Sequence, residues 1–88
     1  MRDTKLKIKV MVFAKFKEVA NTGDFELHLP LGTNVGKAIT EICLKYPSLN
    51  LEDAKFLIAV NYDYADYDKV LQDGDEIALI PPVSGGWA

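Results

Sequence analysis

The chain has 88 residues, of which 49% are hydrophobic and 26% charged, so we expect one globular domain with a single core. Ten Lys and Arg against 13 Asp and Glu give a net charge of −3, which argues against nucleic-acid binding because phosphates select a basic face. No apolar run approaches the ~18 residues of a membrane span and no signal peptide opens the chain, so we expect a cytoplasmic protein that binds no membrane.

The first third of the chain has the pattern of two strands. In residues 5–13 apolar side chains alternate with lysines, and the lysine-bearing face becomes apolar at Met11 and Phe13. A turn cluster at residues 21–24 precedes a second alternation in residues 25–30. Such alternation is typical of half-buried strands, so the two segments predict an antiparallel hairpin.

A helix is predicted next. Thr33 is a suitable N-cap residue, and the apolar side chains that follow it are spaced as one face of a helix. These side chains are Val35, Ala38, Ile39, Ile42 and Cys43. Tyr46 and Pro47 should end the helix, because the residue before a proline avoids the helical region.

Two further strands complete the predicted domain. Residues 56–60 are a continuous apolar run, typical of a central strand buried on both faces. A polar and aromatic segment follows, ends in a turn at residues 72–75 and leads into a last strand at residues 76–80. The order β-β-α-β-β predicts an α+β domain in residues 1–80, with one main helix across a mixed sheet of four to five strands, followed by a tail at residues 81–88.

Side chains suited to catalysis or metal binding are scarce. His28, the one histidine, falls on the outward face of its strand, and Cys43, the one cysteine, falls on the apolar helix face. Asp63, Asp66 and Asp68 lack the spacing of a calcium loop, and neither glycine cluster has the sequence of a phosphate-binding loop. We therefore expect no metal site, no permanently bound cofactor and no enzymatic activity of this domain by itself.

The C-terminal tail combines stiffness with small side chains. Pro81 and Pro82 hold their backbone extended, and Gly85 and Gly86 have no Cβ atoms to collide with the walls of a narrow channel. Residues 81–86 would span about 20 Å when extended. The tail is therefore suited to entering a narrow site, although a frayed terminus is the alternative interpretation of a terminal Gly-Gly pair alone.

Five segments of the chain resemble the small subunit of molybdopterin synthase, a ubiquitin-like sulfur carrier with the β-grasp fold. They are residues 8–14, 32–35, 60–61, 71–78 and 80–86. The most specific are the Asp-Gly-Asp-Glu block and the Pro-Pro-Val-Ser-Gly-Gly block, in that order near the C-terminus. The resemblance implies a β-grasp fold and a role as co-substrate and non-catalytic small subunit.

In that family the chemistry takes place at a C-terminal carboxylate, which the resemblance assigns to Gly86. A ubiquitin-activating-like adenylyltransferase would use ATP to adenylate this glycine, and sulfur would then replace AMP to give a thiocarboxylate. The large subunit of molybdopterin synthase would transfer the sulfur to cyclic pyranopterin monophosphate in molybdenum cofactor biosynthesis. These two proteins are the expected partners.

The resemblance also assigns two groups of binding residues. An apolar patch on the outer face of the sheet would bind the partner proteins, and its expected members are Phe13, Tyr64 and Ile80. The tail would thread into the two active sites, and its expected threading residues are Pro81, Pro82, Val83, Ser84 and Gly85.

The sequence departs from the family pattern at Trp87 and Ala88, which follow the second glycine. A peptide bond at Gly86 leaves no carboxylate to adenylate, and the Trp87 side chain is bulky for a channel sized to glycine. We therefore expect the chain to be trimmed after Gly86, with a deubiquitinase-like metalloprotease as a further partner.

Other functions of the same fold remain open. Extended tails also occur in sulfur carriers for cysteine, homocysteine or siderophore pathways, and a thiamine carrier is less compatible with the Pro-Pro-Val-Ser-Gly-Gly block. A ubiquitin-like protein modifier or an interaction module would use the fold without sulfur transfer.

Overall fold

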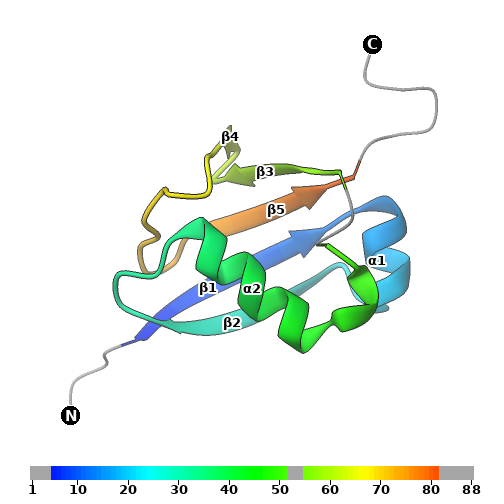
Figure 1. The fold of residues 1–88 in the computed structure, drawn as a ribbon, viewed down its shortest axis with the longest axis horizontal. Coiled ribbons are helices and arrows are strands. Elements are labelled where there is room, and N and C mark those ends of the chain that lie inside the picture. Colours follow the sequence, from blue (N-terminus) through cyan, green and yellow to red (C-terminus); the bar gives the residue numbers. More distant parts are fainter. Residues whose placement is uncertain (1–4, 52–54, 82–88) are drawn as a thin grey trace.

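A computed structural model describes residues 5–51 and 55–81 of the chain. Two helices and a short 3₁₀ turn accompany a five-stranded sheet (Figure 1). The elements in chain order are β1 (Lys5–Val12), α1 (Ala14–Ala20), β2 (Asp24–Pro30), α2 (Val35–Lys45), η1 (Pro47–Leu49), β3 (Leu57–Val60), β4 (Asp63–Tyr64) and β5 (Glu76–Ile80).

The sheet is mixed, as predicted, with the strand order β2-β1-β5-β3-β4. β1 pairs with β2 in antiparallel fashion and with β5 in parallel fashion, and β3 is antiparallel to both β5 and β4. Parallel neighbours need a long crossover, and the chain between β1 and β5 supplies one that contains both helices. The last strand is therefore central in the sheet, with β1 on one side and β3 on the other.

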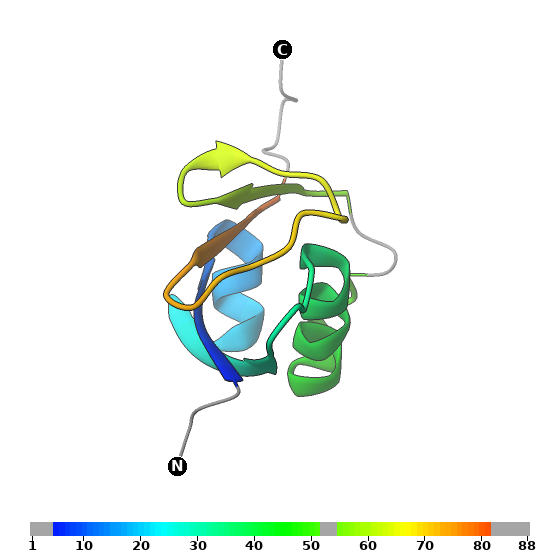
Figure 2. The same ribbon diagram turned by 90° about the vertical axis from the view of Figure 1, so that its left-hand side faces the viewer.

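Both helices lie on one face of the sheet (Figure 2). The alternate residues of β1 that point to this face are buried, and they form one core with Phe16 of α1 and Ile42 of α2. The β1 members of this core are Leu6, Ile8, Val10 and Val12. The alternation in β1 thus predicts its buried face correctly, and Ile77 and Leu79 continue that face on β5.

α1 was not predicted. The β1–β2 pairing is antiparallel as expected, from Lys5 opposite Pro30 to Met11 opposite Asp24, but the connection is a seven-residue helix rather than a turn alone. Only Phe16 and Ala20 of this helix are buried, which is too short a pattern for helical periodicity to stand out. β1 also ends one residue earlier than expected, because Phe13 is the N-cap of α1.

The N-cap of α2 is Asn34 rather than Thr33. The Asn34 side-chain oxygen accepts a hydrogen bond from the Lys37 backbone N–H at 2.9 Å. The Thr33 hydroxyl instead donates to the Pro30 carbonyl at 2.7 Å and closes the turn before the helix. Both residue types cap helices well, so the backbone path selects between them. The predicted end of the helix at Tyr46 is confirmed.

The polar and aromatic segment before the last predicted turn contains β4, whose two residues pair with β3. Asn61 and Tyr62 join the two strands with φ values of 52° and 75°. Two successive residues with positive φ are the mark of the tight hairpin turn whose twist matches that of the strands. The hairpin thus arises from a turn without glycine, which the sequence pattern does not reveal.

Candidate functional site

The face of the sheet opposite the helices carries the candidate site. Within the described residues no helix covers this outer face (Figure 2). Its side chains are the alternate residues of each strand, and the strand registers fix which of them are neighbours. Leu57 lies opposite Ile80, and Ala59 lies between Ala78 and Tyr64.

One half of the outer face is apolar. Met11 pairs with Ala78 in the same cross-strand row as Ala59 and Tyr64. Phe13 follows Val12 in an extended conformation, so it continues β1 towards the position beside Ile80. We call this set the outer apolar patch. Its members are Met11, Phe13, Leu57, Ala59, Tyr64, Ala78 and Ile80.

The structure therefore places all three predicted partner-binding residues in one patch. Phe13 is 40% exposed and Tyr64 75% exposed, while Ile80 is half-buried. An aromatic pair beside half-buried aliphatic side chains is typical of a protein-binding surface. The alternation in residues 5–13 predicts the outward position of Met11. The places of Leu57, Ala59 and Ala78 depend on strand register, which no local pattern gives.

The other half of the outer face is charged. Lys9 lies opposite Glu26 on one side and Glu76 on the other, and such opposite charges across strands are mildly stabilising. His28 is exposed as predicted, and its Nε2 lies 3.8 Å from the Glu26 carboxylate. We call this set the charged half. Its members are Lys5, Lys7, Lys9, Glu26, His28 and Glu76.

The Asp-Gly-Asp-Glu block has a structural role in this site. One Asp75 carboxylate oxygen accepts from the Asn61 side-chain amide at 2.9 Å, and the other accepts from the Gln72 backbone N–H at 2.8 Å. The Asn61 side-chain oxygen in turn accepts from the Glu76 backbone N–H at 3.0 Å. Gly74 has φ of +88°, which glycine adopts without strain. These bonds fasten the β3–β4 hairpin, and with it Tyr64, to the start of β5.

The root of the tail is fixed at the other end of β5. Ile80 is the last residue of that strand, and Pro81 after it is buried. The predicted threading residues Pro82, Val83, Ser84 and Gly85 and the predicted reacting residue Gly86 lie outside the described residues. The tail therefore starts beside the outer apolar patch, from the strand that carries Ala78 and Ile80.

Side-chain chemistry within the domain is sparse. Among residues 5–51 and 55–81, no three His, Cys, Asp or Glu side chains gather as a metal site would require. In the same ranges, no helix is long and apolar enough to cross a membrane. Cys43 is partly buried against the core.

The chain matches the ThiS family over residues 10–86. It is 37% identical over 81 residues to the molybdopterin synthase sulfur carrier subunit of Arabidopsis thaliana, a match that covers 92% of this chain and 84% of that protein. The matched segment of the family ends at Gly86, so Trp87 and Ala88 lie beyond it.

Solved structures show the same fold. Subunit 1 of a molybdopterin converting factor from Pyrococcus furiosus superposes with a TM-score of 0.80 at 36% identity, covering 89% of this chain and 99% of that one. SAMP1 from Haloferax volcanii superposes with a TM-score of 0.83 at 26% identity, covering 91% and 99%. One chain of a complex of subunits 1 and 2 of the molybdopterin-converting factor from Helicobacter pylori superposes with a TM-score of 0.66 at 27% identity. The match covers 92% of this chain and 100% of that one.

Proposed function

Because the chain belongs to the ThiS family, we propose that it is a ubiquitin-like sulfur carrier of molybdenum cofactor biosynthesis and the small, non-catalytic subunit of a molybdopterin synthase. The observation that carries this proposal is the identity of 37% with a molybdopterin synthase sulfur carrier subunit over 92% of the chain. The absence of a second His or Cys agrees with a protein that is a co-substrate, because the reacting group is then supplied by the main chain.

The reaction at Gly86 has two steps. The Gly86 carboxylate attacks the α-phosphorus of ATP and releases pyrophosphate, which turns a poor leaving oxygen into a good one. Hydrosulfide, HS⁻, then adds to the carbonyl carbon, expels AMP and loses its proton, leaving a thiocarboxylate. We assign the first step to an adenylyltransferase related to ubiquitin-activating enzymes.

The free carboxylate must first be produced. Gly86 is joined to Trp87 in this sequence, so hydrolysis of that peptide bond has to precede adenylation. We assign this cleavage to a metalloprotease of the deubiquitinase-like type. The family match, which ends at Gly86, supports a mature chain that ends there.

The outer apolar patch serves as the binding surface for the large synthase subunit. The Helicobacter pylori structure contains subunits 1 and 2 together, which supports such a partner for this chain. Phe13 and Tyr64 of the patch are exposed, and Ile80 of the patch precedes Pro81, the root of the tail. Docking through the patch would therefore aim Gly86 at the partner's active site, and Pro81 to Gly86 would reach about 20 Å into it.

The test compares the 88-residue chain with a chain that ends at Gly86, using the cell's adenylyltransferase and ATP. Only the shorter chain should release pyrophosphate and, with a sulfur donor, gain the mass of a thiocarboxylate. A chain that ends at Gly86 and carries Gly85→Ala has the same length as the shorter chain. It therefore separates the effect of tail length from the effect of the missing side chain at Gly85. Equal adenylation of both chains would refute trimming, and adenylation of neither would refute the carrier role.

The likeness to SAMP1, a small archaeal modifier by its name, favours a second candidate: a protein modifier whose Gly86 is joined to lysine side chains of other proteins. Mass spectrometry of the native cell distinguishes the two. A carrier yields free chain with a thiocarboxylate, whereas a modifier yields branched peptides in which Gly86 is linked to lysine.

A further inference from the structure

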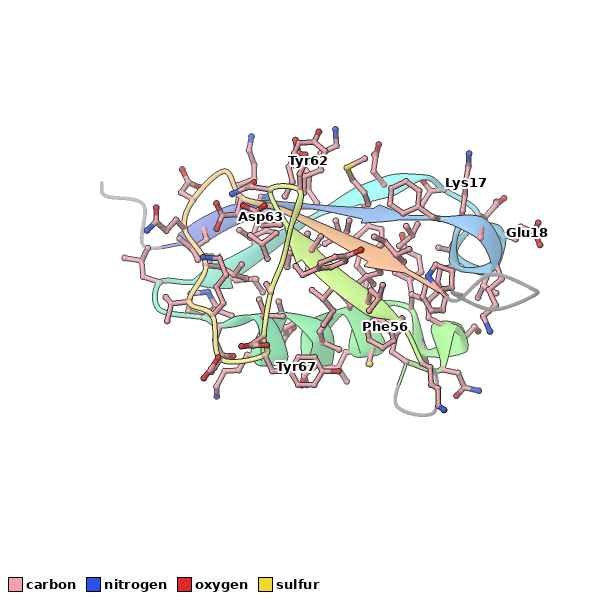
Figure 3. The ribbon with its side chains drawn as sticks, turned by 90° about the horizontal axis from the view of Figure 1, so that it is seen from above. Lys17, Glu18, Phe56, Tyr62, Asp63 and Tyr67 are labelled. Carbon is pink, nitrogen blue, oxygen red and sulfur yellow. The ribbon has the colours of Figure 1, made fainter. Side chains whose placement is uncertain are left out.

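A surface pocket of about 400 Å³ lies at the β3–β4 edge of the sheet. We call it the edge pocket. Its lining residues are Phe56, Leu57, Ile58, Tyr64, Ala65, Asp66 and Tyr67. Figure 3 shows Phe56 and Tyr67 on the same side of the β3–β4 hairpin, away from Tyr62 and Asp63 at its turn. Two of the lining residues, Leu57 and Tyr64, also belong to the outer apolar patch.

The edge pocket offers aromatic and aliphatic walls with a polar rim. Phe56 and Leu57 are half-buried and Ile58 is buried, whereas Tyr67 is 59% exposed. The Phe56 ring is held edge-on against Phe16, with the ring centroids 5.9 Å apart. The pocket wall is thus anchored to the core, and its aromatic and aliphatic lining suits a flat apolar group.

The tail begins two strands from this pocket. Ile80 pairs with Leu57, which itself lines the pocket. From β5 across β3 to β4 the separation is two strand spacings, about 10 Å. Residues 82–86 link the buried Pro81 to Trp87, and that length spans about 20 Å. The tail is therefore long enough to turn back and reach the pocket, and Gly85 and Gly86 permit the reversal.

Trp87 is the only tryptophan of the chain and has the chemistry that the pocket fits. An indole buries roughly 150–250 Å² of surface and stacks favourably with other aromatic rings. Its single N–H donor needs an acceptor, and the Asp66 carboxylate and the Tyr67 hydroxyl belong to the pocket lining. A short tether gives an effective concentration of the order of millimolar, so even weak contacts suffice for docking.

We propose that, in the 88-residue chain, the indole of Trp87 docks into the edge pocket and holds the end of the tail against the β3–β4 edge. Because Tyr64 belongs both to this pocket and to the outer apolar patch, the docked indole also covers part of the partner-binding surface. Trimming then has two effects: it creates the Gly86 carboxylate and it uncovers Tyr64. This second consequence rests on the proposed function, whereas the docking itself does not.

Tryptophan fluorescence tests the docking directly, because the one indole reports only on Trp87. The 88-residue chain should emit at a shorter wavelength than the same chain unfolded in urea, and acrylamide should quench it less. The shift should persist on dilution, as expected for docking within one molecule. Emission equal to that of the unfolded chain would refute docking, and loss of the shift on dilution would refute docking within one molecule.

Substitutions locate the indole. Tyr67→Ala removes an exposed wall of the pocket and should move the emission to longer wavelength, whereas Tyr67→Phe should keep the shift. Tyr62→Ala is the matched control, because Tyr62 is 86% exposed and does not line the pocket. Equal emission from Tyr67→Ala and Tyr62→Ala would place Trp87 elsewhere and overturn the proposal.

Amide NMR spectra provide a second measurement that requires no substitution. Removal of Trp87 and Ala88 should shift the resonances of residues 56–58 and 64–67 and leave those of residues 24–30 unchanged. Unchanged resonances at the pocket would contradict docking. None of these measurements involves sulfur or ATP, so failure of docking and failure of the carrier function are distinguishable.

Discussion

The same strands build both faces of the sheet, but the inner face packs in the core and the outer face carries the outer apolar patch. On β5, Ile77 and Leu79 are completely buried under the helices, while Ala78 and Ile80, which alternate with them, face outward and are half-buried. Burial of the inner residues stabilises the fold, because removing a large apolar side chain from water contributes about 1.5–3 kcal/mol. The outer residues contribute less to stability and leave an apolar surface for a partner. Adjacent residues in one strand therefore differ in what their substitution should change.

The inner face should respond most strongly. Leu79→Ala leaves a cavity at a residue that is 0% exposed and should lower the free energy of unfolding by about 2–5 kcal/mol. Urea denaturation measures this loss. The neighbour Ile80→Ala is the matched control on the outer face and should lose distinctly less. Equal losses at the two positions would mean that the outer face is as tightly packed as the core.

On the outer face, a charge in the apolar patch should affect binding rather than folding. Phe13→Arg should weaken binding of the large synthase subunit by about 2 kcal/mol, or roughly 30-fold, as at other aromatic anchors. Its free energy of unfolding should change by no more than about 0.5 kcal/mol. Calorimetric titration against that subunit and urea denaturation measure the two effects. Unfolding of the variant would instead assign Phe13 to the core.

The hydrogen bonds of Asp75, which fasten the β3–β4 hairpin to the start of β5, should have an intermediate effect on the free energy of unfolding. Asp75→Ala removes the acceptors of the Asn61 amide and of the Gln72 N–H and should cost about 1–3 kcal/mol. Hydrogen exchange should become faster at the amide of Ala65, which bonds to the Ile58 carbonyl across the hairpin. Asp68→Ala, at an exposed acid of the neighbouring loop, is the control, and an equal loss there would remove any special role for Asp75.

The charged half of the outer face should respond least. His28 and Glu26 have side chains that are each 60% exposed, so the contact between them should contribute less than about 0.5 kcal/mol. His28→Ala should therefore change neither the urea midpoint nor large-subunit binding measurably. A loss of binding comparable to that of Phe13→Arg would extend the partner-binding surface beyond the outer apolar patch.

Local patterns in the sequence predict much of this fold. The alternation of β1, the helical spacing of α2 and the bounds of β5 each depend on near neighbours in the chain, and the structure confirms them. α1 was missed because a seven-residue helix with two buried side chains has too little periodicity. β4 has only two residues, and its hairpin turns at Asn61 and Tyr62 without glycine, so no local pattern indicates it.

The sequence predicts the candidate site only in part, because the site too depends on pairing between residues far apart in the chain. The family resemblance identifies Phe13, Tyr64 and Ile80, and the structure places them in one patch. The remaining patch members and the edge pocket require the register of β1, β3, β4 and β5, which long-range pairing determines. An apolar residue on a strand does not by itself reveal which neighbours surround it.

The central position of β5 has a mechanical consequence for the proposed entry of the tail into other proteins. β1 and β3 bond to β5 on opposite flanks, and these bonds run across the strand axis. A pull on the tail acts along that axis, so it loads both rows of bonds in shear and does not open them one after another. Both rows of hydrogen bonds therefore share the load when the C-terminus is pulled, so we expect the body to resist unfolding while the tail enters a channel.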